Sequence, residues 1–491
     1  MFQELKTGEM MTEDHSEREE AAGMDLEGYA ERYIRKGGSS DEEISEKMTE
    51  RILEIRETGR EEAKKLADAV LKETRFAAAA AGMNEGGKSR TGDAAGKDVL
   101  HYAPSGVTVG RFGIGSRGRG DFYAHGLIGR VIGKTNAVID SSDLDDSGIV
   151  SSGDSQFVVV TVDGIHSRLS AFPFLSGFHA ARAALRDIYT MGSRPLAMLS
   201  DVHIADDGDV SVLFDHIAGI SAVGELTGIP LVTGSTLRIG GDMVIGTRMT
   251  GCVGAVGTLP DRLSMTSRNK TEPGDVILMT EGAGGGTVVT AAIYSGYEKA
   301  PEVIEKTLNV DFLMTCDALI ESGCSRKAHA MTDVTNGGIR GDAAEISKEA
   351  GVRLVFRYDD MIACVAPEVL DMFRELNIDP LGVSIDSLLI ICPPEDAAEI
   401  SETVRSAGVN IREVGRAETG SGVVLIKDGE ETDFTPLFRE SAYTPVKKVV
   451  GEKTPDDFEE MKKAVDKAAD DAVSKKERIV GIIREKQKTG K

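Results

Sequence analysis

The chain has 491 residues, of which 41% are hydrophobic and 28% charged; this composition is typical of a globular protein, and the length favours two or three domains over a single core. Its 57 Lys and Arg face 81 Asp and Glu, a net charge of −24, which argues against a nucleic-acid partner because phosphate backbones are bound by basic surfaces. The five cysteines form no CxxC pair and no apolar run reaches the length of a membrane span, so we expect a cytoplasmic protein without a membrane segment.

The first hundred residues predict a helical extension. Residues 39–43 (SSDEE) are typical of a helix N-cap followed by an acidic first turn. Apolar residues then recur at helical spacing from Ile44 to Ile55. We expect residues 1–99 to form a flexible N-terminus, a helical arm and a linker over residues 84–98. The arm could dock a protein partner or simply pack on its own domain.

Strands and turns begin near Leu100. Residues 157–162 (FVVVTV) predict a buried strand, and residues 176–191 predict a helix that stops at Gly192. Further strands are expected over residues 196–204, 229–233 and 243–256, and a second α/β region starts at Gly274. The predicted domains are residues 100–263 and 264–447, followed by a charged helix over residues 448–491.

Four aspartates give the clearest chemical pattern. Asp145 and Asp146 lie in a polar turn, Asp163 ends the FVVVTV strand, and Asp187 lies on the next helix. Hard carboxylate oxygens that converge in this way suit Mg²⁺, which shares its remaining positions with phosphates and water. Taken singly, each has a structural alternative: Asp163 could form a turn, and Asp187 could pair with Arg182 or Arg186.

A glycine-rich segment over residues 109–120 (VGRFGIGSRGRG) precedes these aspartates. Glycines allow backbone N–H groups to approach phosphate oxygens, and arginines add charged donors. The segment fits neither a P-loop nor a dinucleotide fingerprint, so a mobile surface linker is the alternative. The candidate nucleotide-binding residues here are Gly110, Gly113, Gly115, Arg117 and Gly118.

Two further turns carry candidate ligands. Gly234, Ser235 and Thr236 follow a predicted strand and could bind a phosphate or base, or form an ordinary hydroxyl-bonded turn. Asp333 and Asn336 lie in a glycine-rich turn before a predicted helix, whose N-terminus is a natural anion site. An ordinary capped helix is the alternative for this second turn.

Taken in order, these motifs resemble the PurM-like ATP-binding superfamily, which includes AIR synthetase, SelD, ThiL and HypE. Residues 145–150 (DDSGIV), 161–164 (TVDG) and 184–197 (ALRDIYTMGSRPLA) are similar to its DDAAV, TD(G/S) and NDI–MGA–PLA elements, with Arg186 where Asn is usual. In the second half, the matching elements are residues 274–277 (GDVI), 332–338 (TDVTNGG) and 376–381 (LNIDPL).

The resemblance implies an α+β, PurM-like two-domain fold to which the N-terminal helices are added. Its N-terminal domain would pair with a twin into a β-barrel, so a homodimer is expected. ATP would lie in a cleft between the two domains, with Mg²⁺ on the four aspartates and residues 110–120 around the nucleotide. Asp333 and Asn336 would border the acceptor, a small-molecule substrate.

Two departures from family patterns narrow the expected reaction. The chain ends in a charged tail without a terminal cysteine, which argues against dehydration of a thiocarboxamide as in HypE. The first cysteine is Cys252, whereas selenophosphate synthesis would usually need one before Asp143. The chain resembles archaeal AIR synthase-related proteins most. We expect a Mg²⁺-dependent, ATP-binding enzyme that activates an amide, carbonyl or acid oxygen by phosphoryl transfer. The alternative is a nucleotide-responsive binding or maturation protein without turnover.

Overall fold

The computed structural model describes residues 23–80, 99–100, 102–153, 156–335, 337–440 and 442–489. The chain forms two compact units. The first consists of Met1–Arg90, Ile204–Asp209 and Arg238–Arg248, and the second of Thr91–His203, Val210–Leu237 and Met249–Lys491.

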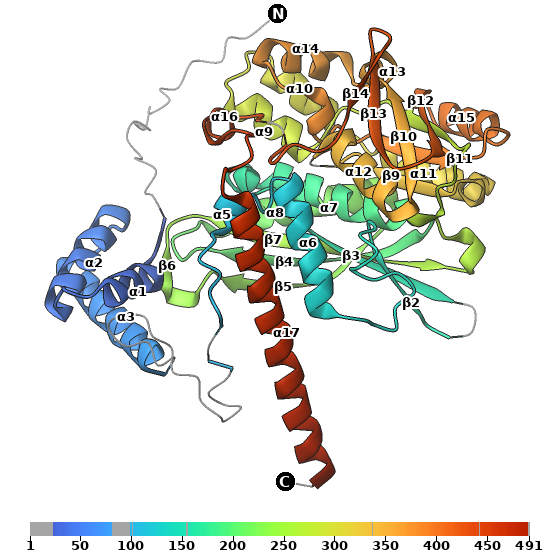
Figure 1. Ribbon diagram of the computed structural model, residues 1–491. Coiled ribbons are helices and arrows are strands. Elements are labelled where there is room, and N and C mark those ends of the chain that lie inside the picture. Colours follow the sequence, from blue (N-terminus) through green and yellow to red (C-terminus); the bar gives the residue numbers. More distant parts are fainter. Residues whose placement is uncertain are drawn as a thin grey trace, which may run out of the picture. The chain divides into compact units, whose positions relative to one another are not determined.

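The first unit is a helical bundle completed by two later segments of the chain. Its helices are α1 (Leu26–Lys36), α2 (Asp41–Ile55) and α3 (Arg60–Ala80) (Figure 1). The predicted N-cap of α2 is confirmed, since Ser40 and Glu43 form a capping box. Strand β1 (Met24–Asp25) pairs antiparallel with β6 (Val244–Ile245), and Arg56 forms ion pairs with Asp206 at 2.5 Å and Asp207 at 2.6 Å. The helices are therefore attached to a hairpin from a distant part of the sequence.

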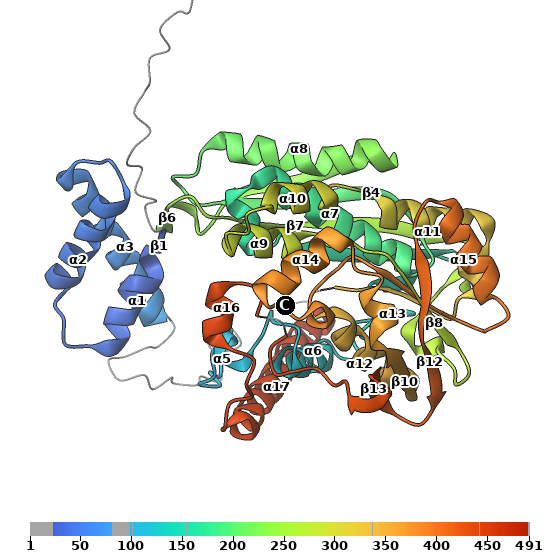
Figure 2. The same ribbon diagram turned by 90° about the horizontal axis from the view of Figure 1, so that it is seen from above.

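The second unit begins with a five-stranded sheet in the order β2-β3-β7-β4-β5. The strands are β2 (Gly148–Ser151), β3 (Phe157–Gly164), β4 (Arg194–Ile204), β5 (Leu231–Arg238) and β7 (Met249–Leu259). Helix α7 (Pro173–Thr190) covers one face, where Val159 is fully buried (Figure 2). On the other face Val160 and Val162 are 41% and 65% exposed. The predicted strand is therefore present but buried on one face only, because alternate side chains of β3 face outward.

Helix α8 (Val210–Thr227), which the sequence patterns did not reveal, packs on α7. The two helices approach closely at glycines: a Cβ on Gly177 would lie 2.0 Å from the His216 carbonyl oxygen, and one on Gly219 2.2 Å from that of Phe174. Among the described residues, α8 is the helix whose length and composition would allow it to cross a membrane. Its buried residues include His216, Gly219, Ile220 and Val223, on the side that packs on α7.

The C-terminal domain of the second unit is built on a seven-stranded sheet in the order β14-β13-β10-β12-β8-β11-β9. Its strands are β8 (Val276–Thr280), β9 (Ala330–Asp333), β10 (Val352–Arg357), β11 (Leu388–Cys392), β12 (Ile411–Thr419), β13 (Gly422–Lys427) and β14 (Glu430–Asp433). Its helices are α9 (Gly286–Tyr294), α10 (Ala300–Thr307), α11 (Asp311–Ser322), α12 (Gly338–Ala350), α13 (Tyr358–Ile362), α14 (Pro367–Leu376), α15 (Ala397–Ser406) and α16 (Pro445–Val450). Strand β11 is buried at every position, which explains its continuous apolar sequence.

The glycine-rich segment is helical at both ends, and only its middle forms the expected loop. It forms the short helix α5 (Val109–Phe112), a tight turn, and the start of helix α6 (Arg119–Ile132). The C-terminal helix α17 (Phe458–Thr489) packs along α6 (Figure 1). Phe112 and Met461 are both buried in the cluster that joins these elements. The charged tail therefore supports the glycine-rich turn.

Candidate functional site

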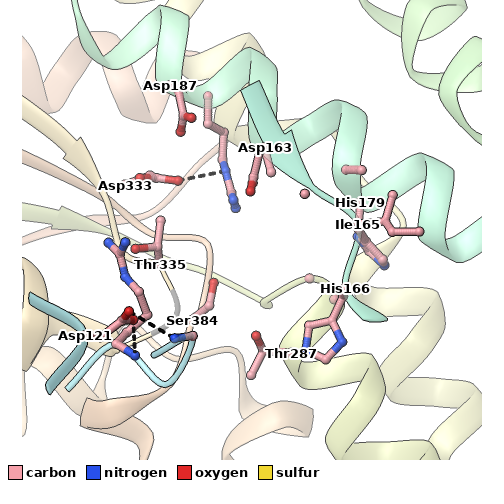
Figure 3. Close-up of a pocket in the computed structure, with 18 of the residues that line it drawn as sticks. Asp121, Asp163, Ile165, His166, His179, Asp187, Thr287, Asp333, Thr335 and Ser384 are labelled. Atoms are coloured by element: carbon pink, nitrogen blue, oxygen red, sulfur yellow. Dashed lines mark hydrogen bonds and ion pairs between the residues drawn. The ribbon is translucent and has the colours of Figure 1, made fainter. Parts of the chain in front are cut away.

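A cavity of about 980 Å³ lies where strand β3, helix α7 and the glycine-rich turn meet the C-terminal domain. Sites for small molecules commonly have volumes of about 300–1,000 Å³, so this cavity is large for one ligand. Figure 3 shows Asp163, Asp187 and Asp333 gathered at one end, and His166 with Thr287 at the other. We call these the acidic end and the basic end; the basic end is defined by Arg168, Thr287, Lys447 and the N-terminus of α9.

All four predicted metal ligands, Asp145, Asp146, Asp163 and Asp187, line the cavity. The hydroxyl of Thr161 on β3 donates a hydrogen bond of 2.9 Å to the Asp187 carboxylate, which fixes helix α7 against the strand. The alternative pairing of Asp187 is wrong, because Arg182 forms its ion pair with Asp386 and Arg186 forms ion pairs with Asp386 and Asp333.

Asp145 and Asp146 are tied to one buried arginine. Arg268 donates to the Asp146 carboxylate at 2.5 Å and to Glu345 at 2.8 Å. The Ser267 hydroxyl donates to Asp145 at 2.5 Å. The N-terminal and C-terminal domains are thus joined by charge-assisted hydrogen bonds between residues that line the cavity.

A second arginine, Arg186, lies between acids of both domains. Its Nε is 3.0 Å from Asp333 Oδ2, at a geometry that makes no hydrogen bond, and its guanidinium also contacts Asp386. Both carboxylate oxygens of Asp333, and Oδ2 of Asp146, are buried without a hydrogen-bond partner. Such atoms are costly unless a ligand or ion satisfies them.

The acidic end carries more negative than positive charge. Burial raises the pKa of Asp187 well above its usual value, and the carboxylates of Asp333 and Asp163 raise it further. Burial also raises the pKa of Asp333 to about 7, against the opposing effect of Arg186, and that of Asp145 to about 6. Arginines compensate these acids only in part.

These residues fit a divalent cation. As they lie, no three acidic, histidine or cysteine side chains in the described ranges form a complete metal cluster. Mg²⁺, however, takes as few as one or two protein carboxylates when phosphates and waters complete its shell. The unpartnered oxygens and the excess of buried carboxylates are what such an ion would satisfy.

The glycine-rich turn brings only part of its predicted set to the cavity. Gly115 and Arg117 line it, and the Asp121 carboxylate accepts their backbone N–H groups at 3.0 and 2.7 Å (Figure 3). Gly110, Gly113 and Gly118 do not line it. Gly118 is needed for packing instead, since a Cβ there would lie 2.3 Å from the Phe438 carbonyl oxygen.

Of the other predicted ligand residues, some line the cavity and others do not. Asp333 lines the cavity at the end of β9. Gly234, Ser235 and Thr236 lie on β5, an edge strand of the five-stranded sheet, and do not line the cavity. Asn336 lies outside the described residues.

The sequence patterns did not predict several residues that line the cavity. They are Arg268, Asp386, Glu345, His166, Arg168, Thr287, Thr290, Tyr443 and Lys447. None of them belongs to a pattern with a recognisable spacing, although the Gly282–Gly286 run just before Thr287 is a usable signal of close backbone approach.

The two α+β domains and the carboxylate-lined cavity between them agree with a PurM-like protein. Comparison with known families agrees. The N-terminal domain model of AIR synthase related proteins matches residues 144–256, and the C-terminal domain model matches residues 272–461. The chain is 50% identical over 468 residues to the protein MJ1416 of Methanocaldococcus jannaschii, covering 95% of this chain and 99% of that protein. The chain belongs to the AIR synthase related family.

More distant relatives share part of the chain. The selenide, water dikinase of Geobacter metallireducens is 33% identical over 228 residues, which are 46% of this chain and 62% of that enzyme. Among solved structures, AaThiL complexed with AMPPCP and TMP superposes with a TM-score of 0.50 at 17% identity, covering 66% of this chain and 97% of that one. This second likeness concerns the fold alone.

Proposed function

We propose that the chain is a cytoplasmic, Mg²⁺-dependent, ATP-binding enzyme that transfers a phosphoryl group to an amide, carbonyl or acid oxygen of a small molecule. The observation that carries this proposal is the set of buried carboxylates at the acidic end, with unpartnered oxygens on Asp146 and Asp333. Because polyphosphate would be repelled by these acids, a bridging cation is needed to bind it there. The family and the dikinase relative support the same chemistry.

The residues take distinct roles in this proposal. Asp145, Asp146, Asp163 and Asp187 would hold Mg²⁺, which would neutralise the phosphates and align the transferred group. The side chain of Arg117 would contact the nucleotide and Gly115 would border it, while their backbone N–H groups stay bonded to Asp121. Arg186 would stabilise negative charge that develops on the phosphoryl oxygens.

Asp333 is suited to proton transfer from the acceptor. A general base works best when its pKa lies near the working pH, and burial raises the pKa of Asp333 to about 7. It lies at the end of β9, facing the acids of the N-terminal domain (Figure 3). With an amide acceptor, Asp333 would accept the proton that the amide nitrogen loses as the amide oxygen attacks the phosphoryl group; a carboxylate acceptor has no proton to lose.

The test is phosphate release from ATP with Mg²⁺ by the full chain, together with binding of a non-hydrolysable ATP analogue. We expect Asp163→Asn and Asp187→Asn to lower turnover by about a hundredfold or more, since each removes a charge that holds the metal. Asp143→Asn is the matched control: Asp143 lies outside the cavity and accepts the Asp140 backbone N–H at 2.7 Å, a bond that Asn retains. Wild-type turnover in both cavity variants would contradict the proposal, and analogue binding without phosphate release across a substrate panel would favour a nucleotide-responsive binding protein.

We also propose that the chain forms a homodimer through the uncovered face of the five-stranded sheet. Val160, Val162 and Leu199 are exposed on this face, and Leu199 lies over Gly254, where a Cβ would be 2.2 Å from its Cδ1. A contiguous exposed apolar sheet face is a typical association surface. The predicted docking of a protein partner on the N-terminal helices stays a prediction.

A further inference from the structure

The basic end of the cavity contains two cations without acidic partners. Within the described ranges, neither Arg168 nor Lys447 forms an ion pair. Each lies against an aromatic ring instead: the Arg168 guanidinium is 3.8 Å from the centre of the Tyr294 ring, and Lys447 Nζ is 4.4 Å from that of Tyr443. In a chain with a net charge of −24, cations left free at a cavity wall indicate a site for a negative group.

The N-terminus of α9 faces the same place. This helix begins at Gly286 after Gly285, and no side chain caps it. Its first-turn N–H groups therefore lack partners within the helix and carry a partial positive charge. The glycine lets the helix approach closely, since a Cβ on Gly286 would lie 3.3 Å from the His166 Cβ. Backbone donors are thus brought to the cavity wall.

Thr287 gives an independent indication of a ligand. Its side chain is only 5% exposed, lines the cavity, and forms no hydrogen bond to other described residues. In Figure 3 its side chain points into the cavity beside His166. Because the residue is otherwise buried, its hydroxyl is open only to the cavity, where a bound group can form a hydrogen bond with it.

The surrounding groups hold this end in place. His166 Nε2 lies 3.1 Å from the Tyr443 hydroxyl, and its Nδ1 lies 3.1 Å from the Thr290 hydroxyl, so the ring is fixed between the two domains. The carboxylate of Asp386, which lies beside Gly285, is paired with both Arg182 and Arg186. Its charge is therefore already compensated and does not cancel that of the basic end.

We propose that the basic end binds an oxyanion, a carboxylate or phosphate group, that belongs to the acceptor substrate. Arg168 and Lys447 supply the charge, and Thr287 with the first N–H groups of α9 supplies the hydrogen bonds. This inference rests on the proposed function, because it places the acceptor opposite the nucleotide phosphates. The acceptor is then a small molecule with an anionic group at one end and the oxygen that receives the phosphoryl group at the other.

The experiment measures anion binding to the full chain saturated with Mg²⁺ and a non-hydrolysable ATP analogue, so that phosphate sites for the nucleotide are occupied. The probes are inorganic phosphate and acetate, titrated by calorimetry at low ionic strength. The two arms show which oxyanion the basic end prefers. We expect Arg168→Gln, Lys447→Gln and Thr287→Val each to weaken binding of the preferred anion, the two charge variants by about tenfold or more.

Lys448→Gln is the matched control, because it removes the same charge one residue away, outside the cavity lining. The analogue should bind all variants with wild-type affinity, which also shows that they are folded. Equal anion affinity in wild type and variants, or no anion binding by the wild type, would overturn the inference. Failure of the analogue to bind the wild type would instead contradict the proposed function; anion binding to the ligand-free protein would then test the basic end by itself, with the same variants.

Discussion

Replacing Asp333 by Asn should make the ligand-free protein more stable while it removes activity. Asp333 is fully buried, neither carboxylate oxygen has a hydrogen-bond partner, and its pKa is raised from 3.8 to about 7, first by burial. The folded protein therefore holds a charge that the unfolded chain would carry at lower cost. An amide of the same shape has no charge to bury.

The size of the effect follows from the pKa. At about 1.4 kcal/mol per pH unit, a rise from 3.8 to about 7 corresponds to a cost of roughly 4 kcal/mol above pH 7. This cost already includes the attraction of Arg186, which the variant loses together with the charge. The amide is itself a buried polar group without a hydrogen-bond partner, so we expect a net gain of about 1–3 kcal/mol at pH 8. Because the folded pKa is raised, the cost is absent below pH 3.8, grows between pH 4 and 7, and is complete above pH 7. The advantage of the variant should therefore shrink as the pH falls from 8 to 5.

Urea unfolding of ligand-free protein at pH 8 and pH 5 measures this difference. Asp121→Asn is the control with the opposite sign, since Asp121 is equally buried but accepts two backbone N–H groups; we expect it to lose about 1–2 kcal/mol. If Asp333→Asn is less stable than wild type at pH 8, or if its gain is the same at both pH values, the reasoning from the buried charge is wrong.

Two further predictions follow from the same structure. Arg268→Met leaves Asp146 and Glu345 buried without their cation. We therefore expect denaturant titration to show a loss of about 3–5 kcal/mol in the free energy of unfolding. A loss below about 1 kcal/mol would contradict the role given to this arginine. Val162→Asp places a charge on the exposed sheet face and should convert the proposed dimer to a monomer in light scattering, whereas Val449→Asp on α16 should not; an unchanged mass would exclude this face as the interface.

The sequence was sufficient for the elements whose information is local. The N-cap of α2, the strand Phe157–Gly164 and the helix that stops before Gly192 all depend on neighbouring residues, and all were predicted. The four aspartates were found because they lie on short motifs in a recognisable order. Helix α8 was missed because it is apolar on much of its surface, so its sequence shows little amphipathic periodicity.

The site residues that were not predicted depend on contacts between distant segments. Arg268 reaches Asp146 across more than a hundred residues, and Arg186 reaches Asp386 across two hundred. No spacing in a single sequence encodes such a pair. Gly118 illustrates the same limit, since its glycine is required by the carbonyl oxygen of Phe438 in another domain, whereas in sequence it looks like part of a phosphate-binding loop.

The arrangement of charges also explains how ligand binding would strengthen the association of the two domains in the second unit. Asp163 and Asp187 come from the N-terminal domain, Asp333 from the C-terminal domain, and Arg186 spans the boundary between them. A cation bound among these carboxylates would relieve repulsion across that boundary, so its binding energy would appear as tighter association of the two domains. The Thr161–Asp187 hydrogen bond holds the Asp187 carboxylate in place within the N-terminal domain. A bound nucleotide complex would therefore change the contact between the two domains.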